Sequence, residues 1–196
     1  MKKSFINIDD VGLTKIVREG KKDSSQAFEA LYDRYANNVF TYCSKVLASN
    51  PLLVKDVFQD TFSKFYEVLK NGKNEILSVN AYLIRIARNL CLNEMGRRSF
   101  NTISIDKIDI SFNDNSSESK ELSEIINLAI DTLPDEFKEV IVMKELMDMS
   151  YPEIAEALDI EQSLIRVRVY RAKQKLRKIL EPYLKDFYYT DNKILG

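Results

Sequence analysis

The segment Ser150–Leu180 limits the possible folds more than any other part of the chain. Ser150 followed three residues later by Glu153 forms a capping box, and the proline between them falls in a first helical turn, where it costs no hydrogen bond. These signals predict a short helix over about 151–158, with its apolar residues on one face. A break at 159–161 follows.

A second helix is predicted after the break, with a narrow apolar stripe on an otherwise basic surface. The stripe consists of Ile165, Val169, Ala172 and Leu176, at the spacing of one helix face. Between Glu161 and Leu180 there are seven basic residues and one acid, a net charge of +6. A short helix, a tight turn and a basic helix have the layout of a helix-turn-helix, whose second helix enters the DNA major groove. The alternative is an ordinary helical hairpin whose basic face is solvated.

Composition indicates an all-α protein. The chain has 196 residues, 45% of them hydrophobic, which is enough for one large domain or two small ones. Only 5 Gly and 4 Pro are present, and hydrophobic residues recur at helical spacing. Lys and Arg number 29 against 30 Asp and Glu, so any affinity for nucleic acid must depend on where the charges lie.

Several kinds of chemistry are excluded by the residues that are absent. The chain has no His, and Cys43 and Cys91 lie far apart without a CxxC motif. We therefore expect no His-dependent catalysis, no metal site, no cofactor and no small-molecule substrate, and hence no enzyme. Two isolated cysteines fit a reducing cytoplasm. Neither a signal peptide nor a membrane span is predicted, because no apolar run is long enough.

Two domains are predicted from the order of the segments. Before residue 98, apolar residues at helical spacing predict helices over about 26–48, 52–69 and 79–95, after a short apolar face that ends at Gly20. Residues 99–120 are rich in Asp, Asn and Ser and predict a flexible acidic linker. Residues 121–196 hold two further helical patterns, the helix-turn-helix and a short tail from 181 that is expected to pack on the last helix. The expected fold is thus two helical domains, 1–98 and 121–196, joined by a flexible acidic linker, with a C-terminal helix-turn-helix.

Motifs in both domains resemble the extracytoplasmic-function (ECF) sigma factors of the sigma-70 class. AFEALYDRY at 27–35, DVFQDTF at 56–62 and AYLIRIARNLCLNEMGRR at 81–98 are similar to the family's region 2. LPDEFKEVIVMKELMDMSYPEIAEALDI at 133–160, followed by the basic helix, is similar to region 4. The resemblance implies a cytoplasmic subunit that binds core RNA polymerase, recognises promoter DNA and helps to open it. Whether an anti-sigma factor also binds is left open.

The resemblance places a polymerase contact on the predicted helix over 52–69. It implies that Asp56, Gln59 and Asp60 meet the clamp helices of the polymerase's largest subunit. These residues share one polar face, and the opposite face is filled with Phe, so the polar side chains are available to a partner. Without the resemblance, a plain solvated helix face would be the preferred interpretation.

The next helix, with the loop 72–80 before it, resembles the segment that reads the promoter's minus-ten element as single strand. Unpaired bases need stacking surfaces, amide groups and cations. The residues of these types are Tyr82, Arg85, Arg88 and Asn89. Tyr82 stands where the family usually has Trp, and Asn93 where it has Asp. From the residues alone, Tyr82 could equally be a core aromatic whose hydroxyl reaches the surface.

The basic helix resembles the family's recognition helix for the minus-35 element. Its candidate DNA-binding residues are Ser163, Arg166, Val167, Arg168, Tyr170 and Arg171. We expect Arg171 to read a base, and Arg166 and Arg168 to bind phosphates. Val167 and Tyr170 depart from the family's small polar residues and offer contact with thymine methyl groups. The turn over 159–161 lacks the family's usual Gly and Ser.

Two other functions compete with a sigma factor. One is a stand-alone helix-turn-helix transcriptional regulator, which would need neither the polar face over 52–69 nor the basic helix over 79–95. The other is an all-helical adaptor without a DNA role, against which the clustered charge of +6 argues. The sequence does not identify the promoter or the activating signal.

Overall fold

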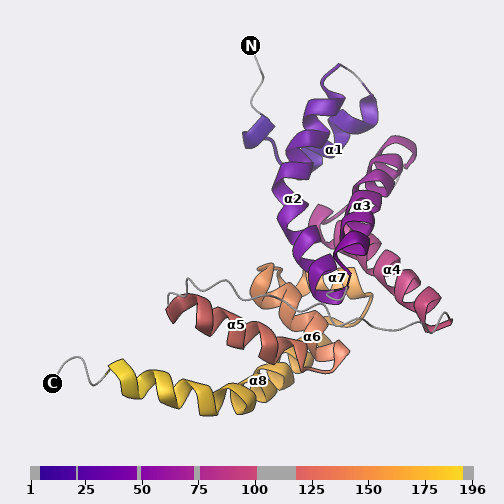
Figure 1. Cartoon of the computed structure of the whole chain (residues 1–196). Coiled ribbons are helices and arrows are strands. Elements are labelled where there is room, and N and C mark those ends of the chain that lie inside the picture. Colours follow the sequence, from indigo (N-terminus) through magenta and orange to yellow (C-terminus); the bar gives the residue numbers. More distant parts are fainter. Residues whose placement is uncertain (1–4, 21, 48–49, 73–75, 101–117, 192–196) are drawn as a thin grey trace. The chain divides into compact units, whose positions relative to one another are not determined.

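A computed structural model of the chain describes residues 5–20, 22–47, 50–72, 76–100 and 118–191. Within these residues the regular structure is helical and no strand occurs, as the sequence predicted (Figure 1). The described residues form two compact units. One contains residues up to 100 together with 152–159, and the other contains 118–151 and 160–191. The predicted linker lies almost wholly outside the described residues.

The first unit begins with helices whose ends are fixed by local signals. Its elements are the 3₁₀ turn η1 (Phe5–Asn7), α1 (Asp10–Glu19), α2 (Ser24–Val46), α3 (Pro51–Asn71) and α4 (Val79–Phe100). Asp9 accepts from the Gly12 N–H at 2.8 Å, and Asn50 caps α3 in the same way by accepting from the Leu53 N–H at 3.0 Å. Gly20 ends α1 in the left-handed conformation, with φ of 63°.

The core of the first unit forms where α2 packs against α1, α3 and α4. Between α2 and α3 the packing is aromatic: the Phe28 ring lies 4.9 Å from the Tyr66 ring and 6.5 Å from the Phe62 ring, both in edge-on geometry. A polar contact ties α1 to α2, because Asp10 accepts from the Tyr35 hydroxyl and from Arg34. Burial and the bond to Asp10 raise the pKa of Tyr35, so it stays a neutral donor.

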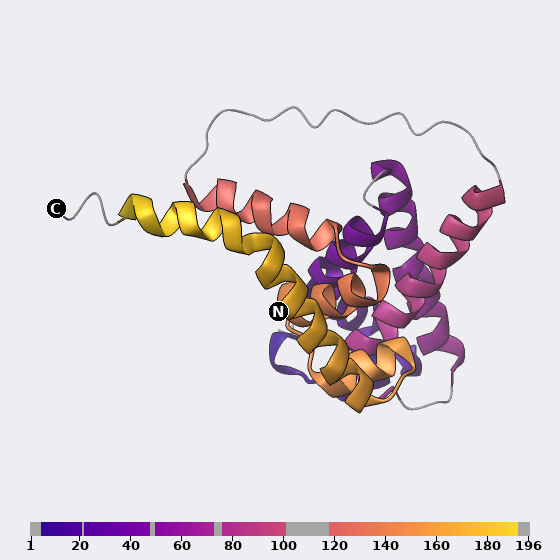
Figure 2. The same ribbon diagram turned by 90° about the horizontal axis from the view of Figure 1, so that it is seen from below.

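The second unit is built around one long helix. It contains α5 (Glu118–Asp131), α6 (Asp135–Ile141), the π-helical turn η2 (Val142–Leu146) and α8 (Gln162–Asp191). Helices α5 and α6 both contact α8, and Figure 2 shows α5 running alongside it. Between η2 and α8 the chain forms α7 (Tyr151–Leu158). The order of a short helix, a three-residue turn and a basic helix was predicted and is confirmed.

Three element boundaries differ from the sequence prediction. Helix α4 continues to Phe100 instead of ending near residue 95. The helix after Pro134 gives way to the π turn at Val142, a wider winding that periodicity cannot reveal. The tail does not form a separate segment from 181, since α8 passes through Pro182 and ends at Asp191. The proline removes only one hydrogen bond, and the flanking turns keep the helix going.

Among the described residues, two other than glycine adopt the left-handed conformation, Asp148 with φ of 50° and Asp159 with φ of 55°. Asp159 follows the last residue of α7, where a glycine is usual and where the departure of the 159–161 turn was noted. An L-residue is strained in this conformation, although aspartate tolerates it better than most. The carboxylate also lies at the negative end of the helix dipole.

We expect Asp159→Gly to stabilise the protein by about 0.5–1 kcal/mol, since it removes both the strain and the charge. Asp159→Asn should give a smaller gain, because it removes only the charge. The exposed helical residue Gln174 is the matched control, and Gln174→Gly should lose about 0.7 kcal/mol. Urea denaturation of the three variants measures these changes. A loss of stability in Asp159→Gly would contradict the interpretation.

Candidate functional site

Helix α8 has one buried stripe and one exposed face. In the predicted stripe, Ile165 and Ala172 are fully buried and Val169 is 2% exposed, so the helix is held by that side. Leu176, the fourth predicted residue of the stripe, is only half-buried. On the opposite side Tyr170 is 65% exposed and Val167 is 43% exposed. Ser163, Arg166 and Arg171 are exposed as well. Except for Arg168, the predicted DNA-binding residues of this helix are therefore exposed to solvent.

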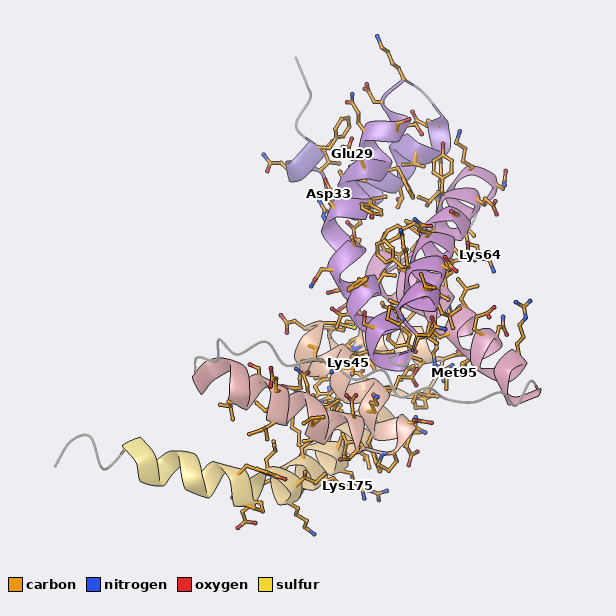
Figure 3. The ribbon with its side chains drawn as sticks, in the orientation of Figure 1. Glu29, Asp33, Lys45, Lys64, Met95 and Lys175 are labelled. Atoms are coloured by element: carbon orange, nitrogen blue, oxygen red, sulfur yellow. The ribbon has the colours of Figure 1, made fainter. Side chains whose placement is uncertain are left out.

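The cations of α8 differ in how they are held. Arg168 is half-buried, and its guanidinium lies 3.4 Å from the Glu136 carboxylate on α6. Arg166 stacks over the Tyr151 ring, 5.0 Å from the ring centre. Lys175, labelled in Figure 3, lies over the ring of Phe137. Within the described part of the chain, the structure gives Arg171 no ion pair or ring contact, so its charge is open to solvent.

A further flank cation of α8 is paired with the π turn. Lys173 binds the Glu145 carboxylate at 2.9 Å, and the pKa of Lys173 is raised chiefly by this hydrogen bond. Lys144, next to Glu145 in η2, donates to the Met149 carbonyl oxygen at 3.0 Å. These contacts of Lys144 and Glu145 were not predicted, because the spacing of apolar residues does not indicate that the helix widens at η2.

The polar face of α3 is exposed as predicted. Asp56, Gln59 and Asp60 all point to solvent, at the spacing i, i+3, i+4 that places them on one face. Gln59 also borders an open groove of about 680 Å³ between α2 and α3. Its walls are mostly aromatic rings and include Phe28, Tyr32, Phe58, Phe62 and Tyr66. The sequence analysis did not identify this groove, since its two walls lie in different helices.

The predicted minus-ten residues lie along α4, with unequal exposure. Asn89 is exposed, whereas Tyr82, Arg85 and Arg88 are half-buried. The Tyr82 ring lies 6.2 Å from the core ring of Phe65, and the Arg85 guanidinium covers it at 5.0 Å. Tyr82 is thus part core residue and part surface. The i, i+3 spacing of Tyr82 and Arg85 was a signal for this contact that the sequence analysis did not use.

Polar contacts fix the start of α4. The Ser78 hydroxyl accepts from the Ala81 N–H at 3.2 Å, as a helix cap does. Asn80 is buried, and its side-chain oxygen accepts from Asn38 on α2 at 3.2 Å. Part of the predicted reading loop over 72–80, residues 73–75, lies outside the described residues.

No cluster of three potential metal ligands occurs among the described residues. None of the described helices combines the length and the apolar character that crossing a bilayer requires. The fold, with its short helix, turn and exposed basic helix, is that of an all-helical protein with a helix-turn-helix.

Comparison with known proteins identifies sigma-70 sequences in both halves of the chain. Residues 31–100 match the family Sigma-70 region 2, and residues 123–176 match the family Sigma-70, region 4. An ECF RNA polymerase sigma-E factor of Haemophilus influenzae is 28% identical over 191 residues, which cover 90% of this chain and 98% of that protein. The protein of the same description from Escherichia coli K12 is 29% identical over 185 residues, covering 87% and 95%.

A solved structure has the same fold. The sigma factor RpoE of Bartonella quintana, determined in complex with the anti-sigma factor NepR, superposes with a TM-score of 0.65 at 20% identity, covering 80% of this chain and 98% of that one. This chain belongs to the ECF sigma factors of the sigma-70 family. It directs core RNA polymerase to specific promoters and initiates transcription there, as the motifs predicted.

We expect the coupling free energy between Arg168 and Glu136 to be small but measurable. Both side chains are partly exposed, so a double-mutant cycle of Arg168→Ala with Glu136→Ala should give a coupling of about 0.2–1 kcal/mol that falls at high salt. The same cycle with Arg171→Ala in place of Arg168→Ala serves as control and should give none. Equal coupling in both cycles would mean that the pair is not specific.

Proposed function

We propose that this sigma factor works through three surfaces: the polar face of α3 for core polymerase, α4 for the opened minus-ten element, and α8 for the minus-35 element. The observation that carries the proposal is the exposure of polar residues on the faces of α3 and α8 that lie opposite a buried apolar side. Among the described residues, Asp56, Gln59, Asp60 and Arg171 have no ion pair, so they are available to partners. Arg166 and Arg168 are already held by Tyr151 and Glu136.

Core polymerase binds at Asp56, Gln59 and Asp60 in this proposal. The three residues supply two carboxylates and one amide, which suit a partner that carries basic and polar side chains. Gln59 connects this face to the aromatic groove between α2 and α3. A partner that reaches the polar face can therefore also bury apolar area in the groove, which adds affinity that polar contacts at a wet rim do not provide.

Helix α4 binds the non-paired strand. Asn89 offers an amide to a base edge, and Arg85 and Arg88 offer cations to the backbone. The Arg85 guanidinium lies 5.0 Å from the centre of the Tyr82 ring, so it occupies one face of that ring. A base can stack on the Arg85 plane, or on the tyrosine ring once Arg85 has moved to a phosphate. Both surfaces are planar, so either one supports stacking.

Helix α8 reads duplex DNA. Tyr170, Val167 and Arg171 are on the face that enters the major groove, and Arg171 keeps its donors for a base. Arg166 is on one flank and Arg168 on the other, where phosphates lie. Arg168 would have to exchange Glu136 for a phosphate, which makes it the weaker phosphate ligand of the two.

We further propose that the chain has two domains, 1–98 and 121–196. The protein acts in the cytoplasm, where polymerase and chromosome meet, and it is not itself an enzyme. Cys43 and Cys91 are buried and are not joined in a disulfide, which suits a reducing compartment. An anti-sigma factor is a further partner, which the complex of the Bartonella quintana protein makes reasonable to test.

We expect Asp56→Ala combined with Gln59→Ala to weaken binding to core RNA polymerase by at least tenfold and to abolish run-off transcription on a promoter library. Both side chains are exposed, so the helical content should not change. Glu124→Ala, an exposed acid on α5, is the matched control and should bind and transcribe as the wild type does. Unaltered affinity in the double variant would remove α3 from the interface.

We expect Tyr82→Ala and Asn89→Ala to impair promoter opening more than the initial closed complex, since their partners are bases that have already unpaired. One lost stacking contact is worth about 1–3 kcal/mol. Permanganate footprinting reports melting, and gel mobility shift reports closed binding. Asn37→Ala, an exposed amide on α2, is the control. Normal melting in both variants would show that α4 does not contact the opened strand.

A further inference from the structure

Two cations from two elements lie over the ring of Tyr151, and a third lies in the same cluster. The Lys144 amine from η2 is 5.5 Å from the centre of the Tyr151 ring, and the Arg166 guanidinium from α8 is 5.0 Å from it. Lys173, about two turns further along α8, is held by Glu145, the η2 residue next to Lys144. With one carboxylate among three cations, this Tyr151 cluster has a net charge of +2.

The cations of the cluster retain donors that the fold does not use. An ammonium group has three N–H donors, and Lys144 spends one on the Met149 carbonyl. A guanidinium that stacks on a ring uses its face, which leaves the N–H groups at its edge for an acceptor. The aromatic ring also fixes the guanidinium in place, so little side-chain entropy is lost when an anion binds.

The two flanks of α8 differ in how their cations are held. Arg166 lies about 100° around the helix from the buried Ile165, between the stripe and the exposed face. On this flank η2 adds Lys144. On the opposite flank Arg168 is occupied by Glu136. When a helix enters the major groove, its flanks come near the phosphates of the two groove walls. The Arg168 flank also carries Lys175, which lies over the Phe137 ring, whereas the flank with the Tyr151 cluster offers two cations from two elements beside one ring.

We propose that Tyr151 is a positioning residue that sets Arg166 and Lys144 to bind backbone phosphates of duplex DNA beside the recognition helix. The proposal rests on the assignment of α8 to the minus-35 element, and it adds two residues, Lys144 and Tyr151, that lie outside that helix. Glu145 neutralises Lys173 in the same cluster. The ligand is the phosphodiester backbone, so the contact carries affinity and orientation and no sequence information.

The test uses holoenzyme, assembled from core RNA polymerase and the full chain, on a promoter fragment obtained by run-off transcription from a library. The slope of log affinity against log salt counts phosphate contacts, at about 0.9 per contact. Lys144→Gln can still donate to the Met149 carbonyl but has no charge. We expect it to reduce the slope by about 0.9 and to weaken all single-base variants of the upstream element alike.

Tyr151→Leu should reduce the slope by about one to two units relative to the wild type, because Lys144 and Arg166 both lose the ring that supports them. The conservative variants Tyr151→Phe and Lys144→Arg should recover most of the wild-type slope, because they keep the ring and the charge. Lys15→Gln, an exposed cation on α1, is the matched control. Arg171→Ala should instead lose affinity mainly at one base position, roughly 5- to 150-fold.

A wild-type slope in Lys144→Gln and in Tyr151→Leu would overturn the proposal and make the cluster a structural brace. If Tyr151→Leu unfolds, as circular dichroism would show, Lys144→Gln and Lys144→Arg still decide the matter. A failure of the proposed function can be told apart from this result. If α8 does not read the minus-35 element, Arg171→Ala leaves the affinity for every variant of the upstream element unchanged, in a holoenzyme that still assembles and transcribes.

Discussion

Burial of one narrow stripe of α8 determines what the rest of that helix can do. Ile165, Val169 and Ala172 fill the space toward the second unit's core, and their burial leaves the helix no freedom to rotate about its axis. A rotation of a few tens of degrees would expose apolar area and cost several kcal/mol. The exposed face is therefore fixed by residues that never meet DNA, and side chains such as Tyr170 need no further device to point outward.

The carboxylates that pair with basic residues of α8 come from other elements of the chain. Glu136 belongs to α6 and Glu145 to η2, and each is about 30 residues before the cation it binds. These acids divide the positive charge of α8 into a part that is neutralised within the fold and a part that is presented to partners. A helix with the same sequence in isolation would not make this distinction.

Much of the fold followed from spacing alone. The bounds of α7 and most of the buried stripe of α8 were predicted because each depends on residues within one or two turns of each other. The exposure of Asp56, Gln59 and Asp60 followed from the Phe-filled opposite face. The aromatic groove, the pairing of Arg168 and the ring stacking at Tyr151 could not be predicted in this way, because their partners are distant in sequence. The roles of the site residues remain predictions.

The groove between α2 and α3 has a consequence for the subunit on its own. Aromatic walls such as Phe28 and Phe58 are only half-buried, so the free protein keeps apolar area in contact with water. A partner that fills the groove binds only the folded chain and stabilises it by mass action, by about 2.7 kcal/mol when present at a hundred times its dissociation constant. The lifetime of the chain before proteolysis is then coupled to the supply of its partners, and surplus subunit is the most exposed to degradation.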